Sequence, residues 1–312
     1  MSAFVVVNPH SANRRTMREW PAIDRLLRAA YPGMSVAFTK ARGDATTLVR
    51  AALHEGHHEV IAIGGDGTIN EATNGFFDEK GPIAPDAVFG FVTSGTGGDF
   101  RKNFGIEPGI AEAIERLRKA PVRHMDIGRL SCLSVHGLPI VRYFTNIASF
   151  GLSGVIVESV NRSRVAKLFG GKFAFAFHSV TAALTFSDHA VRIHTDDGLD
   201  EIARIATVAV ANGQYFGGGM RVAPDAHTDD GLFDVVIMGG SPKHRALSDM
   251  KLLYTGEHIN LPHVRVIRTR KLVAAPVART KGRPVFIEAD GEGVGKLPAT
   301  FEVLPRALNL RC

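Results

Sequence analysis

The sequence has few of the residues and patterns that define disulfide-stabilised, exported or membrane-spanning proteins. Its 312 residues include two cysteines, Cys132 and Cys312, and a single tryptophan. Two cysteines, one of them the last residue, cannot build a disulfide framework, so a reducing compartment is expected. The N-terminus lacks the basic start and the apolar core of a signal peptide. The longest apolar stretch, residues 173–186, is interrupted by His178 and is too short to span a bilayer. These absences predict a cytoplasmic protein.

The charge balance of the sequence is mild. Net charge is +6, from 37 basic and 31 acidic residues. This balance suits anionic nucleotides or an anionic membrane surface, but it is not typical of a nucleic-acid-binding protein. The chain is long enough for two domains, each with its own core. Neither a Walker A motif nor a G-x-G-x-x-G motif is present, so bound phosphates would have to be held by other glycine loops.

The stretch Val60–Phe76, VIAIGGDGTINEATNGF, predicts a strand, a glycine turn and a helix in that order. Three glycines would let the backbone turn sharply and let a ligand approach closely: Gly64, Gly65 and Gly67. Thr68 is the expected N-cap, and the N–H groups of the first helical turn attract an anion. Asp66 has no evident packing role, and a carboxylate beside a phosphate is repulsive without a cation or a proton transfer. The pattern therefore predicts phosphoryl transfer with Mg²⁺.

Up to about residue 120, short apolar strands alternate with amphipathic helices. We expect strands at residues 3–7, 35–39, 60–63 and 88–92, and helices at 14–30, 44–53 (capped by Asp44) and 109–119. This alternation predicts a parallel sheet covered by helices on both faces. The glycine loops would follow the carboxyl ends of strands, where open α/β sheets bind ligands.

After Pro121 the pattern changes to successive strands separated by Gly, Pro, Asn and Asp. We expect strands at residues 127–133, 140–147, 190–194, 205–211, 232–238, 264–268, 271–274, 285–289 and 300–304, interrupted by helices near 154–186 and 242–254. This pattern predicts an antiparallel β-sandwich. The expected domains are therefore an α/β domain over residues 1–122 and a β-rich domain over residues 123–312, with a C-terminal tail that packs back on the first domain.

Four further stretches carry polar residues beside strand ends. They are NPHS at 8–11, TSGTGGDF at 93–100, VANGQYFGGGMRVAPDAHTDDGLFDVV at 210–236 and ADGE at 289–292. The four letters TDDG also occur at residues 195–198, where they lie between two expected strands as an ordinary hairpin turn would. TDDG alone therefore carries little information, and its context in the longer stretch gives the second copy its meaning.

Taken with GGDGT, these stretches resemble the diacylglycerol kinase catalytic domain superfamily, which includes sphingosine and ceramide kinases. The resemblance covers about residues 3–310 in the order of the family. Two positions depart from the family pattern: Gly98 stands where an Asn is usual, and Ala12 stands where a Gly is usual. The resemblance implies an N-terminal α/β domain like that of NAD kinases and diacylglycerol kinases, followed by the β-sandwich.

The resemblance also implies which residues do the chemistry. The implied nucleotide-binding residues are Asn8, Thr39, Gly64, Gly65, Asp66, Gly67, Thr68, Gly95 and Thr96. Mg²⁺ would be held by Asp230 with the backbone carbonyls of His227 and Leu232, and these hard oxygen ligands suit that ion. Glu292 would accept the proton of a lipid hydroxyl, and Asp66 is the other candidate base. The sequence does not choose between these two carboxylates.

The expected activity is that of an ATP-dependent lipid kinase that uses Mg²⁺ and acts on diacylglycerol, a sphingoid base or ceramide. An NAD kinase fits less well, because the Asn-Glu pair directly follows GGDGT here, and because NAD kinases lack a loop like residues 93–100. A lipid-binding regulator without activity is favoured only by Gly98 and Ala12. The expected partner is a lipid at a membrane surface, met through residues 162–186, and no nucleic acid is expected. A homodimer is compatible with the sequence, which does not decide the oligomeric state.

Overall fold

The computed structural model describes residues 3–93, 98–155, 188–240, 246–277 and 284–312. The chain divides into two compact units, Met1–Ile127 together with Leu304–Cys312, and Gly128–Val303. The first unit extends beyond the expected boundary at residue 122, because strand β7 begins at Val122 and continues to Leu133. We describe each unit by itself.

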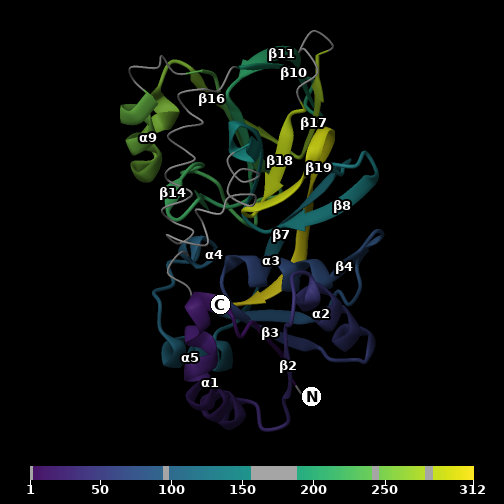
Figure 1. Cartoon of the computed structure of the whole chain (residues 1–312), viewed down its shortest axis with the longest axis vertical. Helices are drawn as coiled ribbons and strands as arrows, with labels where there is room; N and C mark the ends of the chain where they lie inside the picture. Colours follow the sequence, from purple (N-terminus) through teal and green to yellow (C-terminus); the bar gives the residue numbers. More distant parts are fainter. Residues whose placement is uncertain (1–2, 94–97, 156–187, 241–245, 278–283) are drawn as a thin grey trace. The chain divides into compact units, whose positions relative to one another are not determined.

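The first unit is a parallel sheet with helices between its strands. Its elements are β1 (Phe4–Val7), α1 (Ser11–Ala30), β2 (Ser35–Phe38), α2 (Asp44–His54), β3 (Glu59–Gly64), α3 (Asp66–Gly75), β4 (Phe77–Asp78), β5 (Gly81–Pro82), β6 (Val88–Thr93), α4 (Asp99–Lys102) and α5 (Ile110–Lys119). The strand order is β19-β6-β3-β1-β2, with all neighbours parallel. Figure 1 labels strands β19, β3 and β2 of this sheet. The end of β19 enters this sheet, where Asn309 is paired with Val88.

The core of the first unit follows the alternation of side chains along each strand. One face of β1 and β3 packs against α1 and α5, in a cluster that contains Val5, Val7, Ile61 and Ile63. Helices α2 and α3 contact β1, β3 and each other, and cover the other face. They pack closely, because a Cβ at Gly75 would lie 2.7 Å from that of Val49. The expected parallel sheet with both faces covered is confirmed.

Strand register aligns the predicted nucleotide-binding residues along one edge of this sheet. Val7, the last residue of β1, is paired with Phe38 at the end of β2 and with Ile63 in β3. Gly64 at the end of β3 is paired with Thr93 at the end of β6. Because parallel strands end at the same edge, Asn8, Thr39 and the two glycine loops all begin there.

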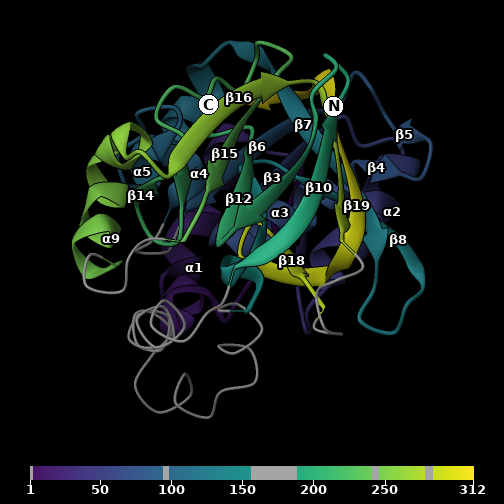
Figure 2. The ribbon, with the colours of Figure 1, turned by 90° about the horizontal axis from the view of Figure 1, so that it is seen from above.

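In its described residues, the second unit consists mainly of antiparallel strands (Figure 2). Besides β7, its elements are β8 (Pro139–Phe144), β9 (Ile147–Gly151), β10 (His189–Thr195), β11 (Asp200–Ile205), β12 (Thr207–Ala211), β13 (Tyr215–Phe216), β14 (Met220–Arg221), β15 (Phe233–Met238), α9 (Ala246–Thr255), the 3-10 helix η1 (Glu257–Asn260), β16 (Val264–Thr269), β17 (Lys271–Pro276), β18 (Phe286–Ala289) and β19 (Glu292–Arg311). Six strands run in the order β16-β15-β12-β9-β18-β19, and β17 connects β19 to β10 and β11.

The central strands of this unit are buried on both faces. In β12, Val208 and Val210 belong to the main core, whereas Ala209 and Ala211 face a second cluster. The second cluster includes residues of the segment that follows β13, such as Met220 and Val222. The segment rich in motif residues therefore covers the outer face of β9, β12 and β15. The predicted β-sandwich-like architecture is confirmed.

Several expected boundaries are wrong for identifiable reasons. The expected strand at 140–147 is two strands, because the amides of Thr145 and Asn146 bind the carboxylate of Asp290 and leave the ladder. The expected strand at 300–304 is the middle of the 20-residue β19, which pairs in turn with β18, β17 and β6. Strand β11 was not expected, because three of its six residues are charged. Most of the helix expected near 154–186 lies outside the described residues.

Candidate active site

Asn8 ties the end of β1 to the first turn of α3. Its amide Nδ2 donates to Thr68 Oγ1 at 3.0 Å, and its Oδ1 accepts the backbone N–H of His10 at 3.0 Å. The expectation that Thr68 caps α3 is wrong. The helix begins at Asp66 with Gly65 as the N-cap residue, so Thr68 lies inside the first turn and its hydroxyl binds Asn8 instead. Asn8 and Thr68 are thus brought together.

Glycine occupies the positions of GGDGT for reasons other than the expected sharp turn. None of the three has a φ in the left-handed region. Gly64 is required by packing, because a Cβ there would overlap the Thr68 side chain. An added Cβ at Gly65 would meet nothing within 4 Å, so the backbone there is open to a ligand. Gly67 lies in the first turn of α3.

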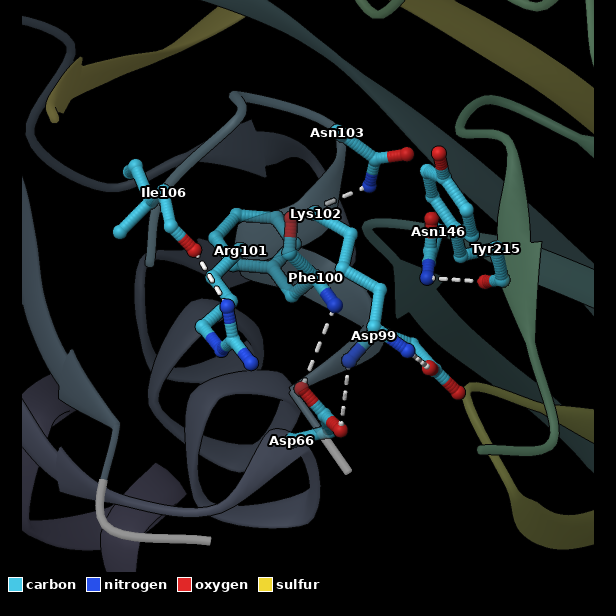
Figure 3. Close-up of polar contacts among 9 residues, drawn as sticks. All are labelled: Asp66, Asp99, Phe100, Arg101, Lys102, Asn103, Ile106, Asn146 and Tyr215. Carbon is cyan, nitrogen blue, oxygen red and sulfur yellow. Dashed lines mark hydrogen bonds and ion pairs between the residues drawn. The ribbon is translucent and has the colours of Figure 1, made fainter. Parts of the chain in front are cut away.

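Asp66 connects the two glycine loops of the first unit. Its carboxylate accepts the backbone N–H groups of Asp99 at 3.1 Å and Phe100 at 3.3 Å (Figure 3). Asp99 in turn pairs with Lys102 at 3.1 Å. The expectation that Asp66 has no packing role is therefore wrong, because its charge satisfies two amides at the start of α4. The same contacts place the carboxylate beside the loop that begins at Thr93.

The remaining predicted nucleotide residues divide into placed and undescribed ones. Thr39 is buried directly after β2, and its N–H donates to the carbonyl of Val7 at 2.9 Å. Gly95 and Thr96 lie outside the described residues. Asp44 does not cap α2 as expected. Its carboxylate accepts the N–H groups of Lys40 at 2.7 Å and Ala41 at 2.9 Å, in the loop before the helix. It thereby orders the loop that begins at Thr39.

In the second unit, the segment after β12 is a polar network around backbone groups. Asn212 is fully buried and donates to the carbonyl of Thr145 at 2.9 Å. Arg221 donates to Gln214 Oε1 and to the carbonyl of Pro224, each at 3.0 Å. Between β13 and β14, Gly217, Gly218 and Gly219 have φ values of 67°, 87° and 111°, which glycine adopts without strain. Asn146 also donates to the carbonyl of Tyr215 (Figure 3).

The two TDDG segments are built differently. Residues 195–198 form the turn between β10 and β11, as expected, and Asp196 accepts the amide of Lys271 at 3.1 Å. In the second copy, Asp230 accepts the N–H of Leu232 at 3.0 Å and forms an ion pair with Arg268. Arg268 also pairs with Asp234 at 2.9 Å, so one guanidinium serves two carboxylates.

The residues around Asp230 supply some of the oxygen ligands that a hard divalent cation needs. Asp234 is buried, and its Oδ2 has no hydrogen-bond partner among the described residues. Burial raises the pKa of Asp234, the charge of Arg268 opposes this, and the nearby carboxylates of Asp230 and Asp225 raise it further. Within the described part of the chain, no three acidic, His or Cys side chains converge on one metal position. A bound Mg²⁺ would therefore need backbone carbonyls, such as those of His227 and Leu232, beside the carboxylate.

Glu292 directly follows a tight turn that is held by Asp290. The Asp290 carboxylate accepts four hydrogen bonds, from the N–H groups of Thr145 (2.8 Å), Asn146 (2.9 Å) and Ile147 (3.0 Å) and from the hydroxyl of Thr145 (2.9 Å). Glu292, the first residue of β19, is half-buried. The turn therefore fixes the backbone from which the predicted base extends.

Sequence reasoning missed the anchoring role of Asp290 and the contribution of Thr145 and Asn146. A signal for Asp290 was present, because Asp-Gly between two apolar runs is a strong hairpin signal. Thr145 and Asn146 gave no such signal, because they seemed to continue the strand that precedes them. Glu288, which is fully buried in this hairpin, also escaped notice.

Comparison with known proteins identifies the family. Residues 2–130 match the diacylglycerol kinase catalytic domain, and residues 146–312 match the YegS C-terminal NAD kinase beta sandwich-like domain. A diacylglycerol kinase of Staphylococcus aureus strain MRSA252 is 30% identical over 311 residues, which cover 99% of this chain and 91% of that protein. The chain belongs to the diacylglycerol kinase family, and the expectation of a diacylglycerol kinase-like enzyme is confirmed.

Solved structures agree on the fold. A crystal structure of a diacylglycerol kinase from Bacillus anthracis str. Sterne superposes with a TM-score of 0.71 at 21% identity, covering 99% of this chain and 96% of that one. The yeast NADH kinase in complex with NADH gives a TM-score of 0.53 at 12% identity, covering 99% and 82%. Within the described residues, no helix is both long and apolar enough to cross a membrane.

Proposed function

We propose that this protein is an ATP-dependent lipid kinase that phosphorylates the hydroxyl group of diacylglycerol or a related lipid. The observation that carries the proposal is the Asp66 carboxylate at the carboxyl edge of the parallel sheet, bound to two amides of the second glycine loop. A carboxylate fixed there, beside backbone that is open at Gly65, suits the positioning of a nucleotide's phosphates and their counter-ion.

In the proposed reaction, a lipid hydroxyl oxygen forms a bond to the γ-phosphorus of ATP while the bond from that phosphorus to the β–γ bridging oxygen breaks. ADP leaves with the electron pair of the broken bond. The hydroxyl proton moves to the Glu292 carboxylate, which is held by the Asp290 turn. Asn8, Thr39, Thr68 and the glycine loops bind the nucleotide. Asp230 and the backbone carbonyls of His227 and Leu232 would hold Mg²⁺. The positive charge of this ion would favour the binding of phosphate groups.

The test is a transfer assay from labelled ATP across a panel that contains diacylglycerol, a sphingoid base, ceramide and NAD. A phosphorylated lipid that depends on Mg²⁺ supports the proposal, whereas phosphorylation of NAD alone overturns it. The likeness to the yeast NADH kinase shows a similar fold alone. NAD is therefore included in the panel to test for phosphorylation of that substrate. Binding of lipid without any transfer, by folded protein with ATP and Mg²⁺, would instead identify an inactive regulator.

A lipid kinase must also meet the bilayer, and we propose that it does so from the surface. Basic residues near anionic lipid contribute about 1 kcal/mol each, screened by salt. The segment expected to do this, residues 162–186, lies outside the described residues. Co-sedimentation with liposomes should therefore increase with anionic lipid and decrease with salt. Binding that ignores both would reject the electrostatic part of the proposal.

A further inference from the structure

Glu288 is a carboxyl group enclosed by the protein. It lies in β18, two residues before Asp290, and none of its surface is exposed. Its Oε2 accepts the backbone N–H of Gly291 at 2.9 Å, and its Oε1 contacts the hydroxyl of Ser149 on the paired strand β9. Among the described residues, its hydrogen-bonding neighbours are both neutral, and no cation contributes to its electrostatics.

The hydrogen bonds around Glu288 can accommodate a bound proton. Ser149 Oγ lies within hydrogen-bond distance of both Glu288 and the hydroxyl of Ser153, at 2.8 Å from the latter. A serine hydroxyl carries one hydrogen, so it cannot donate in both directions. When Glu288 carries a proton, it donates to Ser149, which donates to Ser153. Burial is the main cause that raises the pKa of Glu288 to about 8, and the negative charge of Asp290 acts in the same direction, whereas the hydrogen bonds from Ser149 and Gly291 lower this pKa.

The position of Glu288 gives this proton a mechanical consequence. Ala289 is paired with Glu292, so Asp290 and Gly291 form a two-residue hairpin turn, with φ values of 48° and 85°. The Asp290 carboxylate holds this turn from the side of Thr145, Asn146 and Ile147. Glu288 also binds this turn, by accepting the backbone N–H of Gly291. The carboxyl groups of Asp290 and Glu288 thus both stabilise, through hydrogen bonds, the turn directly before Glu292.

We propose that Glu288, in its protonated form, is a positioning residue that holds the hairpin turn in the geometry Glu292 needs, and that its ionisation loosens this hold. Among the described residues, the charged group that acts on it is Asp290 on the turn, whereas β9 presents the hydroxyl of Ser149. An ionised Glu288 would be a fully buried negative charge beside the partly buried Asp290, with neutral donors to compensate it. The inference rests on the proposed role of Glu292 as the base.

The first test compares wild type with Glu288→Gln and Glu288→Leu in the kinase assay between about pH 6 and pH 9. Glutamine keeps the shape and hydrogen bonding of the protonated acid, so its kcat near pH 7 should stay within about twofold of wild type. Leucine removes both hydrogen bonds, and kcat should fall about tenfold with little change in KM. Relative to the Gln variant, wild-type kcat should fall about tenfold between pH 7 and pH 9. Identical pH profiles, or a Gln variant as slow as the Leu variant, would overturn the proposal.

The second test does not depend on activity, so a failure of the proposed function can be told apart from a failure of this inference. The pKa of Glu288 rises on folding, from its ordinary value of 4.5 to about 8. The stability that its proton contributes is therefore complete below pH 4.5 and is lost as the pH rises towards 8. Chemical unfolding should show wild-type stability declining relative to Glu288→Gln across this window. The infrared spectrum of wild type at neutral pH should contain a protonated-carboxyl band that Glu288→Gln lacks. A flat stability difference together with no such band would overturn the inference, whatever the kinase assay shows.

Discussion

Two Asp-Gly pairs, one in each unit, use a carboxylate in the same way. Asp66 accepts two backbone N–H groups from the loop that starts α4, and Asp290 accepts three from the link between β8 and β9. Each carboxylate therefore fixes a chain segment distant in sequence. They differ in their own local structure, because Asp66 begins a helix whereas Asp290 lies in a hairpin turn at φ 48°.

The difference shows what each carboxylate can add to catalysis. Asp66 accepts hydrogen bonds from two amides at 3.1 and 3.3 Å. These hydrogen bonds are long enough to loosen when a nucleotide or cation binds. Asp290 makes four bonds of 2.8 to 3.0 Å, which leave it little capacity to accept a proton. We therefore expect Asp66 to touch the reacting groups and Asp290 to act through Glu292.

The largest effect should come from Glu292, the residue that we propose Asp290 positions. Glu292→Gln keeps shape and hydrogen bonding but cannot take a proton, so kcat should fall about 100- to 10,000-fold. ATP affinity, measured by calorimetry, should stay nearly unchanged, because the nucleotide residues belong to the other unit. Weaker ATP binding with unchanged single-turnover chemistry would assign Glu292 to the organisation of the site and would pass the base role to Asp66.

Replacing Asp66 should abolish most activity while the fold survives. In Asp66→Asn, one of the two amides faces an NH₂ group, and the charge beside the phosphate site is lost. Hydrogen bonds to a charged group are worth about 1.5–3 kcal/mol, so a fall in turnover of about 100-fold is expected. Circular dichroism should confirm the fold, and near wild-type turnover in the folded variant would contradict the role in phosphoryl transfer.

Asp290→Asn tests the other member of the pair. Loss of the charge that serves four donors should lower the unfolding free energy by about 2 kcal/mol and kcat about 10- to 100-fold. Since Asp290 is proposed to position Glu292, the same substitution in a Glu292→Gln background should reduce kcat much less. Additive losses of kcat in the double variant would show that Asp290 acts independently of Glu292.

The candidate site could be predicted from the sequence to the extent that its residues stand next to one another. Residues 60–76 fixed a strand-turn-helix order, and parallel strands then bring Asn8, Thr39 and the glycine loops to one edge. The partners of Asp66 and Asp290 could not be predicted, because they lie 33 and 143 or more residues away and are backbone amides, which every residue except proline carries. Burial of Glu288 was invisible for the same reason, because which face of β18 is enclosed depends on its pairing with β9.

The two TDDG segments give a matched pair for a smaller effect. Asp230 shares Arg268 with the buried Asp234, whereas Asp197 lies in the turn between β10 and β11. Asp230→Ala should raise the Mg²⁺ concentration needed for half-maximal activity several-fold, because one charged oxygen ligand is lost. Asp197→Ala should leave this concentration unchanged. Magnesium titrations of both variants provide the measurement. An equal Mg²⁺ dependence of the two variants would contradict the assignment of the metal site to the second TDDG.

The smallest effect concerns Gly98, which precedes the amides that Asp66 holds and replaces the Asn usual in the family. Its φ of 63° is left-handed, a conformation that Asn tolerates better than most residues. An added Cβ would lie 2.5 Å from Nε of Arg101, so that flexible side chain must shift. Gly98→Asn should therefore cost less than the roughly 1 kcal/mol expected for Gly98→Ala, and kcat should change about twofold or less. Thermal unfolding and turnover of the two variants measure this. A Gly98→Asn variant that is less stable than Gly98→Ala would show that the Arg101 contact, rather than the backbone conformation, determines which residue this position accepts.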